Sequence, residues 1–482
     1  MLDGVISTYK RVSTLRKEGN FFTTFYFFLL LAWCLYLNFW RTTFYYNLTP
    51  VITIQKLFSQ GIVVAILLFV FIAIYKNRLS QTLAFLTGCI AMLVCGGVIG
   101  FYDLTTALQS VNIDTLSLLF GIGLISVVLA ESNIFDWICR RVLERFGTSN
   151  FALFTALCLL TYFISFFVNN LTTILLVLPI TATIAKALKL NVMPFVAGEI
   201  IASNLGGASS MLGDFPNMLI ATQMNVPFFS FIQYMMPICL INLAIMFGYF
   251  HSKVDFGDHP NDKATIKLPD VKIKNQRELR LQLAIFALMI VLFMFSTVHA
   301  GLLALCGGFS IFLLSSNREE IVRKFRHQDI RFYFLLFVLV GGVKASGLPQ
   351  TVASALSYFS GGSSFIQCVL LMWAACGLTM FLNAGPTTAL FLPIFLGASG
   401  AIPDKLIFWA LSLGVCAGSS GSLTGATAGP VAFTFMERFE GSRRGSLHKR
   451  TFKEYLQYGL PIAYVQLMVS TIYITILFLV RR

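Results

Sequence analysis

The chain has 482 residues, of which 57% are hydrophobic and 12% are charged, and its mean hydropathy is +0.79. This composition excludes an ordinary soluble domain and indicates an integral membrane protein. Apolar runs of about 17–25 residues, the length that crosses a bilayer, recur along the chain, so we expect many spans rather than one anchor. The net charge of +14 does not favour nucleic-acid binding, because Lys and Arg cluster in short loops between the apolar runs.

The cysteine, histidine and motif content argues against an enzyme. The ten Cys lie mostly alone within apolar segments, without a CxxC pair or a Cys/His cluster, so we expect no disulfide framework and no structural metal. No Walker motif is present, and the five His form no catalytic constellation. We therefore expect a protein that is not an enzyme, has no cofactor and does not use ATP directly.

Residues 1–53 form a basic N-terminal segment with an extra transmembrane helix. The apolar run Phe21–Trp40 is too long for a signal-peptide core and lacks a convincing cleavage site, so we predict a retained first span. The positive-inside rule places the basic residues that precede it in the cytoplasm, namely Lys10, Arg11, Arg16 and Lys17.

Residues 54–250 contain five further predicted spans and one interrupted hairpin. The spans cover about Ile54–Tyr75, Leu79–Phe101, Leu116–Ser132, Val192–Met224 and Phe228–Phe250. Basic residues keep the amphipathic piece Phe135–Phe146 inside. The apolar stretch Phe151–Leu188 breaks at Asn169-Asn170, which favours a re-entrant hairpin, although charge equally allows two full crossings. We expect the span that begins at Val192 to be interrupted at Gly206–Pro216.

A polar cytoplasmic linker, residues 251–280, precedes a second half, residues 281–482, that repeats the plan. Its spans cover about Leu281–Val298, Leu302–Leu314, a segment after Asp329, Leu406–Met436 and Leu456–Val480. A second hairpin, about Phe365–Leu396, has its tip at Asn383–Thr388. The span count gives the two halves opposite directions, which predicts inverted repeats with opposed hairpins. The basic loop Arg438–Lys453 then falls in the cytoplasm as required, whereas the terminal Arg481 and Arg482 fall outside.

The two hairpin tips are similar in sequence and spacing. Asn169 and Asn383 each open a polar stretch that ends in paired Thr and precedes a Pro by the same distance. A Gly-rich segment follows each hairpin, Gly206–Asp214 in the first half and Gly418–Gly425 in the second. Irregular backbone at membrane depth is tolerated only where it is buried in protein or lines a cavity. Paired breaks of this kind predict the binding site of a transporter.

The breaks carry groups that suit transported ions. Free N–H groups at half-helix N-termini attract anions, and backbone carbonyls with Asn and Thr oxygens suit a dehydrated Na⁺. The candidate ion or substrate ligands are Asn169, Asn170, Thr172, Thr173, Asn204, Gly206, Gly207, Gly213, Asp214, Asn217, Asn383, Thr387, Thr388, Ser420 and Thr424. A Na⁺ ion is expected at Asn169, Thr173 and Gly213. Simple helix capping would explain one Asn-Thr break, but a matched pair favours a site.

Two acidic residues within the predicted spans are candidate proton carriers, because ionisable groups at membrane depth are costly. Asp214 lies at the predicted break of its span, and its aligned position in the second half is Ala426, so we expect an asymmetric site. A capping role for Asp214 is the alternative. Glu199 lies before it on the same span and could pair with a Lys or carry a proton. Glu131 and Lys344 occupy similar ends of two spans, where an interface role is favoured.

The first-half motifs resemble those of a known transporter group. Asn169–Thr173, Ala202–Gly207 and Leu212–Asn217 are similar, in order, to motifs of arsenite permeases, NhaD-type sodium–proton antiporters, citrate carriers and the P protein, within the ion transporter superfamily. The resemblance covers about Asp114–Phe250 well and Asp329–Phe435 more loosely. It implies two inverted repeats with opposed hairpins, a scaffold that forms a homodimer, and elevator-type movement of a transport domain.

The chain also departs from that pattern. Asp214-Phe215-Pro216-Asn217 stands where the group commonly has Asp-Pro-Pro-Asn. The second half lacks the Asn often found after its small residues, and the second tip has Gly385-Pro386 in place of a fuller Asn-Thr set. One cation site, at the first tip, is therefore expected rather than two.

We predict an all-α polytopic membrane protein with about 11 transmembrane helices plus two opposed re-entrant hairpins in two inverted repeats. It is expected in a bacterial inner (plasma) membrane, with a cytoplasmic N-terminus, lipid around it and a homodimeric partner. Its predicted function is secondary active transport of a small inorganic or organic anion, coupled to Na⁺ or H⁺, by elevator-type alternating access. The alternative is a Na⁺/H⁺ antiporter that uses Asp214. A channel is disfavoured, because opposed hairpins seal a midplane site from both faces.

Overall fold

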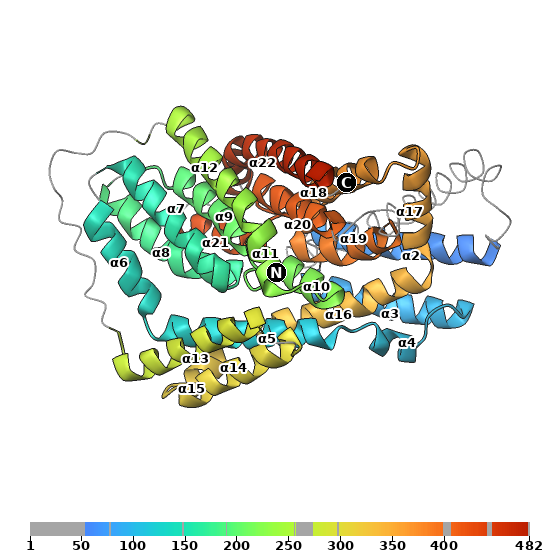
Figure 1. Cartoon of the computed structure of the whole chain (residues 1–482), viewed down its shortest axis with the longest axis horizontal. Coiled ribbons are helices and arrows are strands. Elements are labelled where there is room, and N and C mark those ends of the chain that lie inside the picture. The colour runs from blue at the N-terminus through green and yellow to red at the C-terminus, as the bar shows by residue number, and fades with distance from the viewer. Residues whose placement is uncertain are drawn as a thin grey trace, which may run out of the picture. The chain divides into compact units, whose positions relative to one another are not determined.

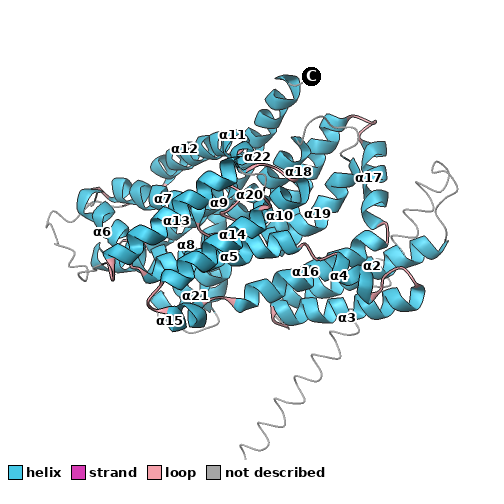
Figure 2. Cartoon of the chain, turned by 60° about the horizontal axis from the view of Figure 1, so that its bottom comes forward, coloured by secondary structure: helices cyan, strands magenta, loops and turns pink. Residues whose placement is uncertain are grey.

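The computed structural model describes residues 54–76, 79–146, 149–188, 190–254, 256, 273–295, 298–398, 406–440 and 446–480 (Figure 1). Across these ranges all regular structure is helical and no strand occurs, as Figure 2 shows. The all-helical prediction is therefore confirmed. The predicted first span Phe21–Trp40, its basic flank and most of the linker lie outside the described residues.

The described residues contain twenty-one helices. In chain order they are α2 (Ile54–Tyr75), α3 (Gln81–Ile99), α4 (Leu104–Gln109), α5 (Ile113–Glu131), α6 (Ile134–Phe146), α7 (Asn150–Phe167), α8 (Asn170–Leu188), α9 (Val192–Ala208), α10 (Phe215–Met224), α11 (Phe228–Tyr234), α12 (Met236–Lys253), α13 (Gln276–Phe295), α14 (Ala300–Leu314), α15 (Arg318–Lys324), α16 (His327–Ala345), α17 (Leu348–Phe359), α18 (Ser364–Leu382), α19 (Ala384–Ala398), α20 (Leu406–Gly421), α21 (Gly429–Glu440) and α22 (Ser446–Val480).

Seven of the described helices are long and apolar enough to cross a membrane, or nine if two bent pairs each count as one span. One of these pairs, α11 and α12, bends by 41°. The remaining apolar helices, which include α8, α9, α14, α19 and α20, are shorter. They are the arms of the predicted hairpins, the first parts of the predicted interrupted spans, and one short span. The predicted total of eleven spans therefore depends on these short or broken helices, and it stays a prediction.

The contacts divide the chain into two compact units, one of residues 1–111 with 334–348 and one of residues 112–333 with 349–482. In the smaller unit, α2 packs on α3, and α3 and the following loop bind the last part of α16. The Cys89 thiol donates to the Leu335 carbonyl at 3.1 Å, and the Tyr102 hydroxyl donates to the Val338 carbonyl at 2.5 Å. These bonds join segments that are more than 200 residues apart in the chain.

The core of the larger unit is the helix pair α9 and α20. Every residue of both helices is buried, and the two helices pack on each other. Because each helix consists mainly of apolar or small residues, with Glu199 and Asn204 of α9 as exceptions, each can be covered on all sides. Helices α7, α8 and α12 surround α9, and α18, α19 and α22 surround α20 (Figure 1).

The two halves of this unit repeat the same contacts. A Cβ added at Gly206 of α9 would lie 2.3 Å from the Tyr162 carbonyl oxygen of α7. At the aligned positions, a Cβ added at Gly418 of α20 would lie 2.4 Å from the Cys376 carbonyl oxygen of α18. The halves also exchange partners, since α10 packs on α19 and α21 packs on α8. The element order and contacts thus follow the internal repeat, and its inversion relative to a membrane stays a prediction.

Backbone breaks with positive φ end two corresponding helices. Asn133 (φ 63°) follows α5 and precedes α6, and Gly347 (φ 72°) follows α16 and precedes α17. Left-handed backbone suits Gly and is tolerated by Asn, so these residues let the chain turn sharply into a new helix.

Helices α5 and α14 of the larger unit cross at close distance (Figure 1). A Cβ at Gly121 would lie 2.2 Å from the Ala304 carbonyl oxygen, and a Cβ at Gly308 would lie 2.8 Å from the Gly121 carbonyl oxygen. The two backbones can approach this closely because neither residue has a side chain.

Replacing Gly121 by Ala should therefore separate α5 from α14 and destabilise the fold by about 1–3 kcal/mol, the usual range for overpacking. The control is Gly248→Ala in α12, where nothing lies within 4 Å of the added Cβ. Thermal melting of the purified protein in detergent should show a clear fall in the midpoint for the first variant alone. Equal midpoints for the two variants would contradict this account of the crossing.

Candidate ion and substrate site

Two short non-helical segments meet at the centre of the larger unit. One is the tip between α7 and α8, at Val168 and Asn169, and the other is the break between α9 and α10, from Ser209 to Asp214. The Asn169 side-chain oxygen accepts from the Leu171 amide at 2.8 Å, and the Asp214 carboxylate accepts from the Phe215 amide at 2.9 Å. Both side chains therefore satisfy the free N–H groups of a helix start, as Asn and Asp commonly do.

A hydrogen bond between Asn170 and Asp214 joins the tip to the break. The Asn170 side-chain amide donates to Oδ2 of Asp214 at 3.0 Å, and the Asn170 backbone amide donates to the Gly213 carbonyl at 3.2 Å. Asn170 is fully buried and Asp214 is 8% exposed. From the other half of the chain, the Thr427 hydroxyl donates to Oδ1 of Asp214 at 3.5 Å.

All donors bonded to Asp214 are neutral, and no Lys or Arg within the described ranges pairs with it. A buried carboxylate that has no basic partner is unstable as an anion and is satisfied by a proton or a bound cation. The capping role and the ion-binding role of Asp214 are thus compatible, because its two oxygens serve different donors.

Glycines give the tip and the break room to meet. A Cβ at Gly207 would lie 2.3 Å from the Asn170 side-chain oxygen, and a Cβ at Gly213 would lie 2.2 Å from the Ser165 carbonyl oxygen. The Ser165 hydroxyl also donates to the Asn170 side-chain oxygen, which fixes the orientation of the amide. The Gly-rich composition of this segment is therefore a packing requirement of the site.

Asn217 binds protein groups with its entire side chain. Its amide nitrogen donates to the carbonyls of Gly207, Ala208 and Ser210 at 3.2, 2.9 and 2.9 Å. Its side-chain oxygen accepts from the Ser412 hydroxyl of α20 at 2.6 Å. Asn217 thus satisfies carbonyls at the end of α9 that would otherwise be free.

The side chain of Asn204, unlike that of Asn217, binds no protein group in the described chain. It is 3% exposed, yet neither of its side-chain polar atoms has a hydrogen-bond partner within the described chain. Leaving a buried amide unpaired costs about 1–3 kcal/mol per group. Its position, one turn before the break in α9, makes it a group that a water molecule or ion could satisfy.

The second tip, between α18 and α19, also carries Asn and Thr side chains but has no acidic residue. Thr387 and Thr388 donate to the carbonyls of Asn383 and Ala384, both at 2.9 Å. Ser420 donates to the Cys416 carbonyl at 3.1 Å, and Thr424 donates to the Met380 carbonyl at 2.6 Å. All four hydroxyls bond backbone of their own half, and the position that matches Asp214 is the apolar Ala426. The expected asymmetry of the two halves is therefore visible in the chemistry of the two tips.

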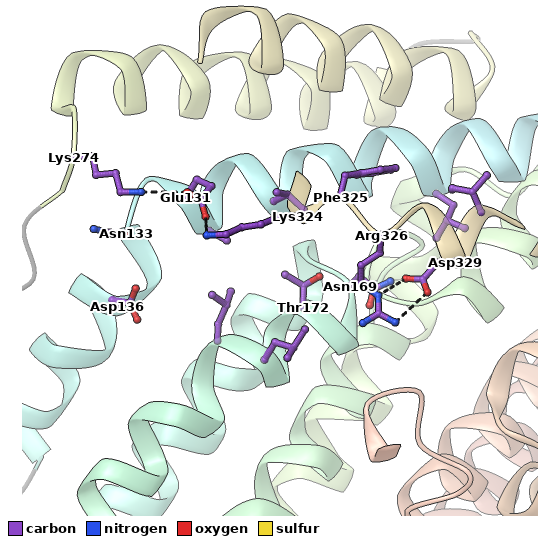
Figure 3. A pocket seen from close by; sticks show the side chains of 17 residues that line it. Glu131, Asn133, Asp136, Asn169, Thr172, Lys274, Lys324, Phe325, Arg326 and Asp329 are labelled. Atoms are coloured by element: carbon purple, nitrogen blue, oxygen red, sulfur yellow. Dashed lines mark hydrogen bonds and ion pairs between the residues drawn. The ribbon is translucent and has the colours of Figure 1, made fainter. Parts of the chain in front are cut away.

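A cavity of about 600 Å³ borders the first tip (Figure 3). Asn169 and Thr172 line it from the tip, and α5, α6 and the segment between α15 and α16 line the other sides. Three basic and three acidic side chains also line it, namely Lys274, Lys324, Arg326, Glu131, Asp136 and Asp329.

Most of these charges are paired. Glu131 accepts from Lys274 at 3.2 Å and from Lys324, and Arg326 donates to Asp329 at 3.0 Å (Figure 3). The hydrogen bond to Glu131 raises the pKa of the Lys324 ammonium above its usual value. Burial raises the pKa of the Asp136 carboxyl, which has no ion-pair partner in the described part of the chain.

Neighbouring residues of the first tip thus face different surroundings. Asn169 lines the charged cavity, whereas Asn170 is buried against Asp214. The start of α8 therefore lies between a cavity lined by charged side chains and the buried Asp214. Two ions of opposite charge could bind on its two sides.

The sequence placed the tip and the break in the site but missed the cavity charges. In the sequence, Lys324 and Arg326 are two of the Lys and Arg residues that lie between apolar runs, and Lys274 lies in the predicted linker. The structure brings all three to the cavity that Asn169 lines. The one available signal was Glu131, whose place at the end of an apolar span required a basic partner.

Comparison with known proteins identifies similar chains. The profile of the CitMHS family, described as citrate transporter, matches residues 66–414. The magnetosome protein MamN of Magnetospirillum gryphiswaldense is 32% identical over 431 residues, covering 86% of this chain and 99% of its own. An uncharacterized transporter of Mycobacterium tuberculosis, Rv2685, is 25% identical over 430 residues, covering 86% of this chain and 98% of its own.

More distant similarity extends to a mammalian protein and to a solved structure. The mouse P protein is 23% identical over 504 residues, covering 86% of this chain and 60% of its own. The crystal structure of the YdaH transporter of Alcanivorax borkumensis matches with a TM-score of 0.55 at 12% identity, covering 82% of this chain and 97% of its own. At that identity the structural match shows a shared fold.

Replacing Gly207 by Ala should disrupt the tip, because the added methyl would displace the Asn170 side chain from Asp214. We expect any stabilisation of the purified protein by Na⁺ or Li⁺ in thermal melting to be lost. The control is Gly377→Ala in α18, where nothing lies within 4 Å of the added Cβ. A Gly207→Ala protein that Na⁺ stabilises as strongly as it does the parent would show that the tip contact is not needed for cation binding.

Proposed function

The chain belongs to the CitMHS citrate transporter family of the ion transporter superfamily and is an integral membrane transporter, and we propose that it moves a small anion coupled to Na⁺ or H⁺. The observation that carries this proposal is the opposite placement of Asn169 and Asn170 on one helix start. The cavity side offers basic groups to an anion, and the buried side offers a carboxylate to a cation.

The anion would bind on the cavity side of the tip. The start of α8, with its positive dipole end, lies at this tip, where Asn169 and Thr172 line the cavity with polar atoms. Lys324 and Lys274 both bind Glu131, and Lys324 also lies 3.3 Å from a carboxylate oxygen of Glu320, so both ammonium groups are held only by carboxylates. A carboxylate anion could therefore bind one of these ammonium groups in place of a Glu131 oxygen.

The coupling cation or proton would bind at Asp214. A bound cation or proton would neutralise the Asp214 carboxylate, which has no basic partner. Because Asn170 is hydrogen-bonded to Asp214, a change in the charge of Asp214 would affect the tip that the anion contacts. Binding at one side can then favour binding at the other, which is the linkage that a coupled transporter needs. By analogy with the resemblance noted above, movement would be of the elevator type in a homodimer.

A second candidate is Na⁺/H⁺ exchange at Asp214 without an anion. It is favoured by the absence of any basic side chain bonded to Asp214 in the described residues. The two candidates differ in the role of the cavity, because pure cation exchange does not require its ammonium groups.

Replacing Asp214 by Asn should abolish coupling in either case, because the amide cannot exchange a proton or balance a cation, while it can still cap α10. Uptake into proteoliposomes should no longer respond to an imposed Na⁺ or pH gradient. Asp103→Asn, which removes an exposed charge but keeps the cap of α4, should behave like the parent. Gradient-driven uptake by the Asp214→Asn protein would refute the proposed role of Asp214.

Replacing Lys324 by Gln should separate the two candidates. For an anion transporter we expect the half-saturating concentration of citrate or a related carboxylate to rise about tenfold, the effect of about one charge-assisted hydrogen bond. Arg323→Gln is the matched control, since Arg323 lies one residue away, pairs with Glu320 and does not line the cavity. If no carboxylate is carried and Na⁺/H⁺ exchange is the same in both variants, the exchanger is the better description.

A further inference from the structure

A second buried acid lies on α9, away from the tip. Glu199 is fully buried, and one of its carboxyl oxygens accepts from the Thr181 hydroxyl of α8 at 2.5 Å. The other oxygen, Oε2, has no hydrogen-bond partner within the described chain. The proposed function uses Asp214 and leaves Glu199 without a role.

Among the residues that the structure describes, no basic side chain is bonded to Glu199. The titratable groups that interact with it are the thiols of Cys139 on α6 and Cys158 on α7, and α8 contributes Thr181. In the described part of the chain, no charged side chain of α12, α20 or α22, which also pack on α9, is bonded to it. A buried carboxyl with a free oxygen and no basic partner binds a proton well.

The position of Glu199 connects it with the site. It lies seven residues into α9, about 10 Å from the start of that helix at the usual rise, and Ser203 follows it by one turn on the same face. The Ser203 hydroxyl lies 3.0 Å from that of Ser165, which binds Asn170. A line of polar groups thus runs inside the protein from Glu199 toward Asp214.

The second half has no counterpart of this acid. The alignment that pairs Asp214 with Ala426 pairs Glu199 with Leu411, a buried apolar residue of α20. Glu199 of α9 and Asp214 of the break that follows α9 therefore both belong to the first half of the chain. Most buried polar groups are hydrogen-bonded, whereas Oε2 of Glu199 has no partner in the described chain.

We propose that Glu199 is a second proton-binding site, distinct from Asp214, that takes up and releases a proton during transport. In the state described here the carboxyl is neutral, and the Thr181 hydroxyl donates to its unprotonated oxygen. Release leaves a carboxylate at Glu199 and requires water to reach Oε2. The proposal rests on the proposed function, and it assigns proton dependence to Glu199 even when Asp214 binds Na⁺.

The test is a pair of measurements on Glu199→Gln in the full chain. Gln has the same size and can still accept from Thr181, but it cannot release a proton. In proteoliposomes that contain a trapped pH-sensitive dye, we expect the proton movement that accompanies citrate or Na⁺ gradients to fall at least tenfold. Thermal stabilisation by Na⁺ should remain, because Asp214 is unchanged. Glu319→Gln, at an exposed position of α15, is the control.

Thr181→Val provides a second variant if Glu199→Gln folds poorly. It removes only the donated hydrogen bond, which favours the charged carboxyl, so the pH at which uptake is half-maximal should rise. Undiminished proton movement in Glu199→Gln, or an unshifted pH profile in Thr181→Val, would overturn the proposal. Loss of Na⁺ stabilisation together with proton movement would also overturn it, because Glu199 would then not be a separate site. An Asp214→Asn protein with intact coupling is a different result, which refutes the proposed function itself.

Discussion

The structure depends on one contact, the hydrogen bond between the Asn170 amide and the Asp214 carboxylate. It joins two segments of irregular backbone that could not exist separately in a hydrocarbon environment. The two segments also satisfy backbone polar groups of each other, since the Asn170 backbone amide donates to the Gly213 carbonyl. The glycines on both sides, the buried serines and the neutral donors around Asp214 all serve to let this contact form. A buried carboxylate without a basic partner costs stability rather than adding to it, which agrees with the proposed ion-binding role of Asp214.

Much of the fold was accessible from the sequence because local chemistry determines it. Asn, Thr and Gly end helices, and Asn169, Asn383, Gly206 and Gly418 were expected at breaks where the structure has helix ends or close helix contacts. Burial of α9 and α20 on all sides was not predicted, because an apolar helix facing lipid and one facing protein have similar compositions. The structure resolves that ambiguity, and it makes these two helices the centre of the larger unit.

The candidate site residues could be named from the sequence, but their contacts could not. Asn170, Asp214 and Asn217 were all expected as ligands, yet Asn217 bonds only protein groups and Asn170 acts on Asp214. The cavity charges could not be found, because Lys274 and Lys324 are separated from the tip by more than 100 residues and carry no local pattern. Their number in loops already had a sufficient explanation in membrane orientation. In the sequence, a loop lysine that lines a cavity therefore cannot be told from one that only sets membrane orientation.

Asn217 has a consequence for how the molecule can move. Its amide group holds three carbonyls at the end of α9 from its own place in α10, and its oxygen is held by Ser412 of α20. Separating any two of these helices would leave several buried polar groups unpaired, at about 1–3 kcal/mol each. The centre of the two halves is therefore expected to travel as a rigid body. In the proposed transport cycle, the buried acid would then become accessible when this block is displaced against its surroundings, without a separation of its own helices.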